Sequence, residues 1–154
     1  MNNLSINNLE DFLTLSSDEL KQLFSQGKTP DTALLHGMAK GLVVKPNWFK
    51  KMNLWRGKVF NQSASGAVSG FNRIGLGSLE ILRYNFNAEI GKSRFSDQNL
   101  LIINHNLPKN PKWVRQFHDE MVEVKPGIYL ATSHYKKRNK LELVSYFVLD
   151  FNRV

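Results

Sequence analysis

The segment from Leu141 to Phe151 alternates apolar and polar side chains, and this alternation limits the possible folds more than any other feature. One face of an extended strand here carries Leu141, Leu143, Phe147, Leu149 and Phe151, and the other carries Glu142, Tyr146 and Asp150. A period of two over this length predicts an antiparallel sheet with one buried face and one solvated face. Such a sheet must curl or pack to bury its apolar side, and a sheet that curls can enclose a cavity.

Seven further segments have the composition of strands, at residues 38–44, 58–62, 67–74, 80–88, 99–105, 120–124 and 128–135. The turns between them are predicted at Gly66, Gly70, Gly91, Pro126–Gly127 and the stretch 136–140. No helix long enough for a parallel crossover separates the strands. About eight strands at hairpin-like spacing predict a mainly β fold, an up-and-down antiparallel barrel just wide enough to hold one small ligand.

Two short helices are predicted before the strands. Asn7 or Asn8 caps the first, and Ser16 and Glu19 have the spacing of a capping box for a second helix over Ser17–Gln26, which Gly27 ends. Both helices are too short to be stable alone, so their apolar stripes must dock on the barrel. Residues 46–54 are predicted to form a helical turn. We expect one domain over 1–154, with a helical arm at 1–35 and the barrel at 36–154.

Composition excludes several kinds of site. The chain of 154 residues has no cysteine, which excludes disulfides, thiolate metal sites and cysteine nucleophiles. It has neither an apolar run of the ~20 residues that a membrane helix needs nor the start of a signal peptide, so we expect a soluble, cytoplasmic protein. The net charge is +8, although the segment 1–35 is acidic. A basic body favours anionic partners, although the same charge can serve solubility alone.

The segment from Trp55 to Phe60 is the first candidate site. A tryptophan beside Gly57 at the start of a strand allows the indole to fold across one end of a barrel, while the neighbouring backbone passes closely. Lys58 or Arg56 can then lie over the indole face. A structural plug without chemistry is the simpler interpretation of these residues.

The second candidate site runs from Arg115 to Glu120. In a strand, Asp119 and Glu120 point to opposite faces, so only one of the two carboxylates faces the interior. We expect Glu120, paired with Arg115, to anchor the polar group of a ligand or to act as a general acid or base. The alternative is a structural salt bridge at the barrel rim.

These segments carry a family resemblance. W-x-G-K-x-F at 55–60, R-x-x-x-D-E at 115–120 and V-x-P-G-x-Y-L at 124–130 resemble a group of uncharacterised bacterial proteins and, more distantly, the unknown-function domains named for a G-x-W-x-G signature. The resemblance covers about residues 36 to 151. It implies a lipocalin-like or calycin-like barrel and no established reaction. The matching residues are Trp55, Gly57, Lys58, Phe60, Asn72, Arg115, Asp119, Glu120, Pro126, Gly127 and Tyr129.

One position departs from this resemblance. Where similar proteins tend to end a strand with Leu-Asp-Tyr, this chain has Ile103-Asn104-His105, so a carboxylate is missing there. The four histidines are too scattered for a metal motif, although His105 and His134 could converge across the sheet. The glycines do not form a dinucleotide fingerprint and no serine lies in a hydrolase elbow. We therefore predict no metal and no cofactor.

The leading hypothesis is a protein that binds an apolar or amphipathic small molecule, lipid-like or aromatic, inside the barrel. The expected interior side chains are Phe71, Tyr84, Phe86, Asn104, Tyr129, His134 and Phe147. The expected ligand-binding residues are Trp55, Lys58, Asn72, Tyr84, Asn104, Arg115, Glu120, Tyr129 and His134. Two alternatives remain open: a small enzyme performing acid–base chemistry, of the isomerase or decarboxylase kind, and an adaptor whose basic loops at 109–115 and 136–140 contact an anionic membrane headgroup or nucleic acid.

Overall fold

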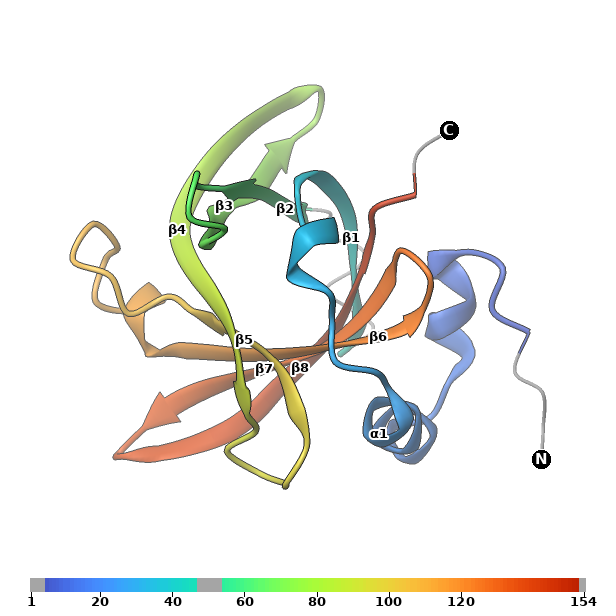
Figure 1. Cartoon of the computed structure of the whole chain (residues 1–154). Helices are drawn as coiled ribbons and strands as arrows, with labels where there is room; N and C mark the ends of the chain where they lie inside the picture. Colours follow the sequence, from blue (N-terminus) through green and yellow to red (C-terminus); the bar gives the residue numbers. More distant parts are fainter. Residues whose placement is uncertain (1–4, 47–53, 153–154) are drawn as a thin grey trace.

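Eight strands follow one another in chain order, each antiparallel to the next, and the last pairs with the first to close a barrel (Figure 1). The computed structural model describes residues 5–46 and 54–152. The strands are β1 (Gly37–Lys45), β2 (Trp55–Gln62), β3 (Val68–Leu76), β4 (Leu79–Lys92), β5 (Asn99–Asn104), β6 (Phe117–Lys125), β7 (Ile128–Lys137) and β8 (Lys140–Asp150). The predicted mainly β fold, an antiparallel barrel of about eight strands with short helices, is confirmed.

The N-terminal helices begin where their capping residues predict. Asn8 caps a 3-10 helix, η1 (Leu9–Thr14), and Ser16 and Glu19 form a reciprocal capping box on the helix α1 (Ser17–Gln26), which Gly27 ends. Two more 3-10 turns, η2 (Thr32–Leu34) and η3 (Val114–Gln116), precede β1 and β6. The helical turn predicted over 46–54 falls almost wholly outside the described residues.

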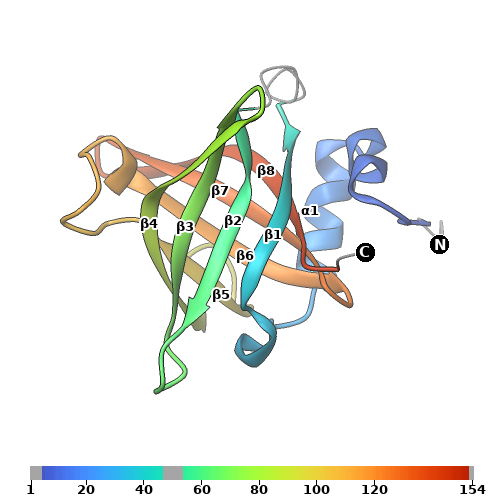
Figure 2. The ribbon, with the colours of Figure 1, turned by 90° about the horizontal axis from the view of Figure 1, so that it is seen from above.

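The helices cover part of the outer wall of the barrel, beside β1 in Figure 2. Phe12 and Leu20 are fully buried there against outward-facing residues of the strands, among them Val122 and Val148. This contact corrects the expectation for β8. Tyr146 was expected on a solvated face but is only 7% exposed, because the helical arm lies over that part of the strand. Strand β8 is therefore buried on both faces along its second half.

One half of the barrel interior is filled by packed apolar side chains. Phe60 contacts Phe86 and Phe151 edge to face or tilted, with ring centroids 5.0 and 5.2 Å apart, and Tyr129 contacts Phe151 as well. Leu35, which follows η2, is fully buried in the same cluster. This end therefore has no room for a ligand. Trp55, which was expected to fold across one end of the barrel, is not among the residues that fill this end. It contacts Phe147 with ring centroids 5.0 Å apart, and Lys58 Nζ lies 5.9 Å from its ring, as expected.

The predicted turns are partly confirmed. Gly66 and Gly127 have positive φ in the β2–β3 and β6–β7 turns, and residues 138–139 turn the β7–β8 hairpin. Gly70 and Gly91 instead lie within strands β3 and β4. A Cβ at Gly70 would stand 1.9 Å from the Val59 carbonyl oxygen and 2.6 Å from the Phe86 ring. Gly70 therefore provides close packing inside the barrel and not a turn.

Candidate functional site

The other half of the barrel encloses a cavity of about 340 Å³. Its aromatic wall residues come from β2, β4, β6, β8 and the segment before β6, and they are Trp55, Tyr84, Trp113, Phe117 and Phe147. Four polar side chains line the same cavity, Lys58, Asn72, His105 and Asp119, and Ser133 and Ser145 add hydroxyl groups. We call the four polar residues the polar cluster.

Strand alternation explains why the polar cluster faces inward. Lys58 is two residues from Phe60, and Asp119 is two residues from Met121, so each shares the inward face of its strand with a buried core residue. Asn72 lies opposite Lys58 in the register of β2 and β3. His105 directly follows β5, in phase with the buried Ile103. Three strands and the residue that follows a fourth therefore bring the cluster together.

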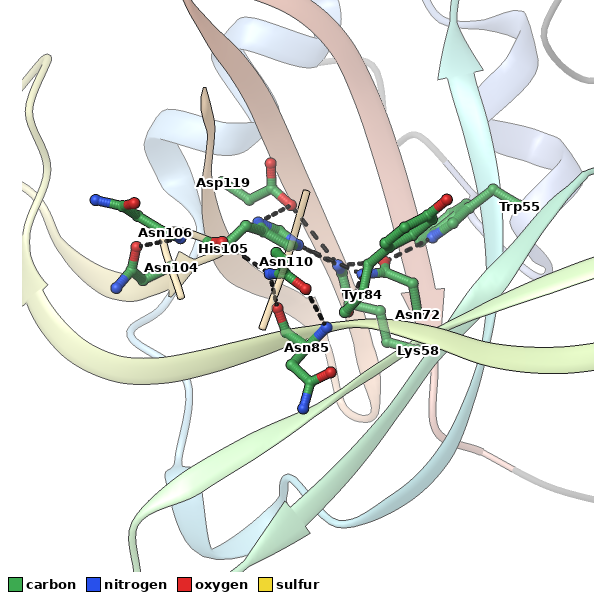
Figure 3. Close-up of polar contacts among 10 residues, drawn as sticks. All are labelled: Trp55, Lys58, Asn72, Tyr84, Asn85, Asn104, His105, Asn106, Asn110 and Asp119. Carbon is green, nitrogen blue, oxygen red and sulfur yellow. Dashed lines mark hydrogen bonds and ion pairs between the residues drawn. The ribbon is translucent and has the colours of Figure 1, made fainter. Parts of the chain in front are cut away.

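Asn72 is the centre of the hydrogen bonding (Figure 3). Its Oδ1 accepts hydrogen bonds from Trp55 Nε1 at 3.0 Å and from Lys58 Nζ at 2.8 Å. Its Nδ2 donates to the carbonyl oxygen of Tyr84 at 2.9 Å. These bonds fix the orientation of the amide, the indole and the ammonium group at once.

The surroundings of His105 determine its protonation. Its Nε2 lies 3.4 Å from Lys58 Nζ and 3.5 Å from Asn72 Nδ2. Both neighbours are donors, so Nε2 is the acceptor and the proton of the neutral ring is on Nδ1. Burial, together with the positive charge of Lys58, lowers the pKa of His105 to about 4. The ring is therefore neutral at pH 7, with Nδ1 3.9 Å from Asp119 Oδ2.

Lys58 is a buried cation, with only 2% of its surface exposed. Burial lowers its pKa to about 8, although the carboxylate of Asp119, at 3.7 Å from Nζ, acts in the opposite direction. The ammonium group also lies 4.8 Å from the ring centroid of Phe86 and 5.6 Å from that of Phe147. At pH 7 the protonated amine is therefore the major form, paired with Asp119 and surrounded by aromatic rings.

Asp119 is incompletely satisfied. Its side chain is 4% exposed, and its Oδ1 has no hydrogen-bond partner among the described residues. A buried carboxylate oxygen without a donor is costly in free energy, on the order of 1–3 kcal/mol or more. Asp119 also lines the cavity, so the carboxylate that lacks a donor belongs to the cavity wall.

The predicted site residues separate into two groups. Trp55, Lys58, Asn72 and Tyr84 line the cavity. Tyr129 faces the interior, but in the filled half. The interior positions expected for Phe86 and Phe147 are confirmed. Those expected for Phe71, Asn104 and His134 are wrong, because they alternate with the inward-facing residues Gly70, Ile103 and Ser133 and so lie on the outer face of their strands.

The predicted anchor of Arg115 and Glu120 is also wrong. Arg115 Nε donates to Asn106 Oδ1 at 2.9 Å, and Glu120 lies on the outer face of β6. The inward carboxylate is Asp119, and its cation is Lys58. The sequence could not assign the faces, because β6 is buried on both sides, with Met121 in the barrel and Val122 beneath the helical arm.

Glu120 belongs to a separate structural contact. It accepts hydrogen bonds from Ser93 Oγ at 2.6 Å and from the amide of Arg94 at 2.9 Å, and it pairs with His118 Nε2 at 2.8 Å. Burial opposes ionisation, but these contacts outweigh it and lower the pKa of Glu120. The carboxylate thus holds the β4–β5 connection against the outer wall. His134 lies on this outer side, so it does not converge with His105.

Sequence reasoning did not place His105, Trp113 and Phe117 in the ligand site. A signal was present for His105, because Leu101, Ile103 and His105 continue one period-two face. For Trp113 no such signal exists, because it lies in a connection. It contacts Tyr84 at 5.3 Å between ring centroids, and both rings line the cavity.

Comparisons with known proteins add support for the fold alone. No family model matches the chain, and no curated protein matches it. A solved structure of a protein from Thermomonospora curvata is similar, with a TM-score of 0.53 and 12% sequence identity over 90% of this chain and 89% of that chain. At this identity the likeness extends to the fold only. No helix in residues 5–46 and 54–152 is long and apolar enough to cross a membrane.

Proposed function

We propose that this protein binds a small amphipathic molecule in the open half of its barrel. The apolar part of the ligand packs against Trp55, Phe117 and Phe147, and a hydrogen-bond donor of the ligand reaches Asp119 Oδ1. The observation that carries this proposal is the cavity itself, in which apolar walls, many of them aromatic, meet the carboxylate of Asp119, whose Oδ1 has no partner among the described residues. Binding pockets combine these features, an apolar lining with a few polar groups that orient the ligand.

The size of the cavity narrows the class of ligand. Small-molecule sites range from about 300 to 1,000 Å³, and 340 Å³ is at the lower end. A compact ring system fits this space better than an extended acyl chain. The charges in the cavity narrow the class of ligand further, because the ammonium group of Lys58 already offsets the negative charge of Asp119. A neutral donor such as a hydroxyl group is therefore preferred over a second cation.

Two ligands of the same shape test the proposal. The aromatic alcohol 2-naphthol carries a hydroxyl donor that naphthalene lacks, and binding of both can be followed by fluorescence. Wild-type protein should bind 2-naphthol about tenfold more tightly, which is the affinity that one hydrogen bond to a charged acceptor adds. In the variant Asp119→Ala this preference should disappear. Equal affinity of the wild-type protein for both compounds would refute the role of Asp119.

A variant whose cavity is blocked by a larger side chain provides a second test of the proposal. Ser145 lines the cavity, so Ser145→Phe should fill it and abolish binding of both compounds. The matched control is Ser69→Phe, which adds the same ring to β3 at a position between the inward-facing Val68 and Gly70 and hence on the outer face. Ser69→Phe should bind as the wild type does. Retained binding in Ser145→Phe would show that the cavity is not the site.

Acid–base catalysis in the same cavity is a second candidate function. It is favoured by the distances from Lys58 Nζ to His105 Nε2, 3.4 Å, and to Asp119 Oδ2, 3.7 Å. A lysine with a pKa of about 8 exchanges protons readily near neutral pH. The test is deuterium incorporation into the methyl group of acetophenone in heavy water, measured by NMR. Catalysed exchange that Lys58→Met abolishes would support this candidate, and exchange at the buffer rate would exclude it for this ketone.

A further inference from the structure

The hairpin between β3 and β4 carries aliphatic side chains that no part of the described chain covers. Leu76 is 75% exposed and Leu79 is 67% exposed, on either side of the turn at Gly77. Ile81 and Leu82 are neighbours on β4 and point to opposite faces of the strand, yet both are largely exposed. The hairpin projects from the barrel at the top of Figure 1. Such a cluster of exposed leucines at a tip marks a contact surface.

Positively charged connections surround the same end of the barrel. In an up-and-down barrel the β3–β4, β5–β6 and β7–β8 connections all lie at one end, which we call the open end. Figure 2 places the β2–β3 turn and η2 at the opposite end. These three connections and the strand ends beside them carry nine basic residues and two acidic ones, in the order Arg73, Glu80, Arg83, Lys109, Lys112, Arg115, Lys136, Lys137, Arg138, Lys140 and Glu142. Among the described residues, only Arg73 of these basic side chains forms an ion pair, with Glu80.

The cavity lies at this open end. Tyr84 on β4 and Trp113 before β6 contact each other and line the cavity, and Trp113 is 54% exposed. The leucines and the basic side chains therefore surround the mouth of the cavity. The acidic helical arm packs elsewhere, against the outward-facing residues of β1, β6, β7 and β8. The charge of the molecule is thus polarised, with the positive side at the mouth.

We propose that the open end docks on an anionic lipid bilayer. The leucines of the β3–β4 hairpin enter the acyl region, Trp113 lies at the headgroup level, and the basic side chains contact lipid phosphates and carboxylates. Interfacial membrane binders combine buried apolar side chains with Lys and Arg in this way. Single-stranded nucleic acid fits less well, because it requires several aromatic rings for base stacking, and aliphatic side chains at a hairpin tip offer none.

The test is sedimentation of the 154-residue chain with lipid vesicles. Vesicles of phosphatidylcholine with about 30% phosphatidylserine should bind the protein at least about tenfold more strongly than phosphatidylcholine alone. About 0.5 M NaCl should weaken the binding, because salt screens the charges. Equal binding to the two kinds of vesicle, or no binding to either, would overturn the proposal. This surface does not depend on the proposed ligand, so Ser145→Phe should bind vesicles as the wild type does.

Matched variants separate the contribution of the exposed leucines to vesicle binding from that of the basic side chains. The double variant Leu76→Ser/Leu79→Ser should lower the partition coefficient about tenfold, and Leu34→Ser/Ile90→Ser, which changes exposed aliphatic residues outside the open end, should leave it within about twofold. Lys136→Gln/Lys137→Gln should weaken binding severalfold, and the control Lys21→Gln/Lys28→Gln, on the acidic arm, should not. All eight positions are exposed, so thermal unfolding measured by circular dichroism should show folded proteins throughout.

A labelled single-stranded oligonucleotide is the competing partner in the same experiment. We expect the oligonucleotide to bind weakly at most, and any such binding to be lost at high salt. Replacing Leu76 and Leu79 should not change it. If the oligonucleotide binds more tightly than the anionic vesicles, and Leu76→Ser/Leu79→Ser leaves that binding unchanged, the open end is a nucleic-acid surface and the membrane proposal is wrong.

Discussion

Single residues inside the barrel have the largest energetic consequences. Lys58 and Asp119 form a buried pair at 3.7 Å, and each would leave the other uncompensated if it were replaced. We expect Lys58→Met to lower the free energy of unfolding by about 3 kcal/mol. The double variant Lys58→Met/Asp119→Leu should recover much of this loss, because it removes both buried charges. Urea unfolding of the four proteins of this cycle measures the coupling.

One result of the double-mutant cycle of Lys58 and Asp119 would contradict this account. If the losses of the two single variants simply add in the double variant, the coupling is absent and the two groups do not act as a pair. The expected coupling is at least about 1 kcal/mol, since the two residues are in contact.

His105 gives the protein a pH dependence that follows from burial. Its pKa falls from 6.5 to about 4 on folding, so the unfolded chain binds a proton between these values and the folded one does not. Stability is therefore lost as the pH falls from about 6.5 to about 4, by an amount on the order of 3 kcal/mol. His134, whose pKa burial also lowers, adds to the same slope.

The variant His105→Gln isolates this contribution. Chemical unfolding between pH 4 and 7 should give a shallower slope for His105→Gln than for the wild type. His36→Gln, which changes an exposed histidine, should keep the wild-type slope. Equal slopes in all three proteins would show that the ring of His105 is not buried in its neutral form.

At the scale of elements, the pairing of β1 with β2 depends on Gly57. Its φ is +128°, and a Cβ there would stand 2.1 Å from the Ala39 carbonyl oxygen across the strand pair. Gly57→Ala should lower the free energy of unfolding by more than about 2 kcal/mol, because strain and a backbone clash add. The control Gly66→Ala has φ +84° but open space around the added carbon, and should lose about 1 kcal/mol. Thermal denaturation that ranks the two variants equally would contradict the close approach.

The helical arm stabilises the barrel from outside and does not touch the cavity. Phe12 is fully buried against the outer wall. We expect Phe12→Ala to lower the free energy of unfolding by about 3 kcal/mol, as large-to-small changes in a core do. The affinity for 2-naphthol, measured at a temperature where the variant is folded, should not change. A reduced affinity would mean that the arm also shapes the cavity.

Most elements were predictable from local patterns, and the directions of several side chains were not. Turn residues and period-two alternation locate all eight strands, and the capping box locates α1 at its observed bounds. Alternation assigns a face only when one face is polar. In β6 the sequence Asp119-Glu120-Met121-Val122 is buried on both faces, so the choice between the two carboxylates depends on the helical arm, which no local pattern places.

At the scale of the whole molecule, the division of the barrel into a filled half and a hollow half is the property that matters for function. The closed barrel follows from the number and spacing of the strands. The hollow half cannot be predicted in this way, because it depends on the sizes of the inward-facing side chains that many strands contribute at the same height in the barrel. In the hollow half, the small side chains of Ser133 and Ser145 leave space. In the filled half, the large side chains of Phe60, Phe86 and Tyr129 occupy the interior.

The polar cluster was only partly predictable for the same reason. Lys58, Asn72 and Asp119 are among the residues that the sequence singled out, but Asp119 was not assigned to the interior and His105 was not placed in the ligand site. Both lie far along the chain from Lys58 and Asn72. Only closure of the barrel brings these four residues together. The sequence of a strand alone does not show whether a polar residue faces the barrel interior or the outer side. That assignment requires the residues that pack on each face of the strand.

A crystal structure of the protein saturated with 2-naphthol tests the central claim most directly. The account predicts the naphthalene ring inside the cavity, packed against the walls formed by Trp55, Phe117 and Phe147, with its hydroxyl group within hydrogen-bond distance of Asp119. A crystal in which the ring is absent from the barrel, or in which aromatic side chains occupy the space, would contradict it.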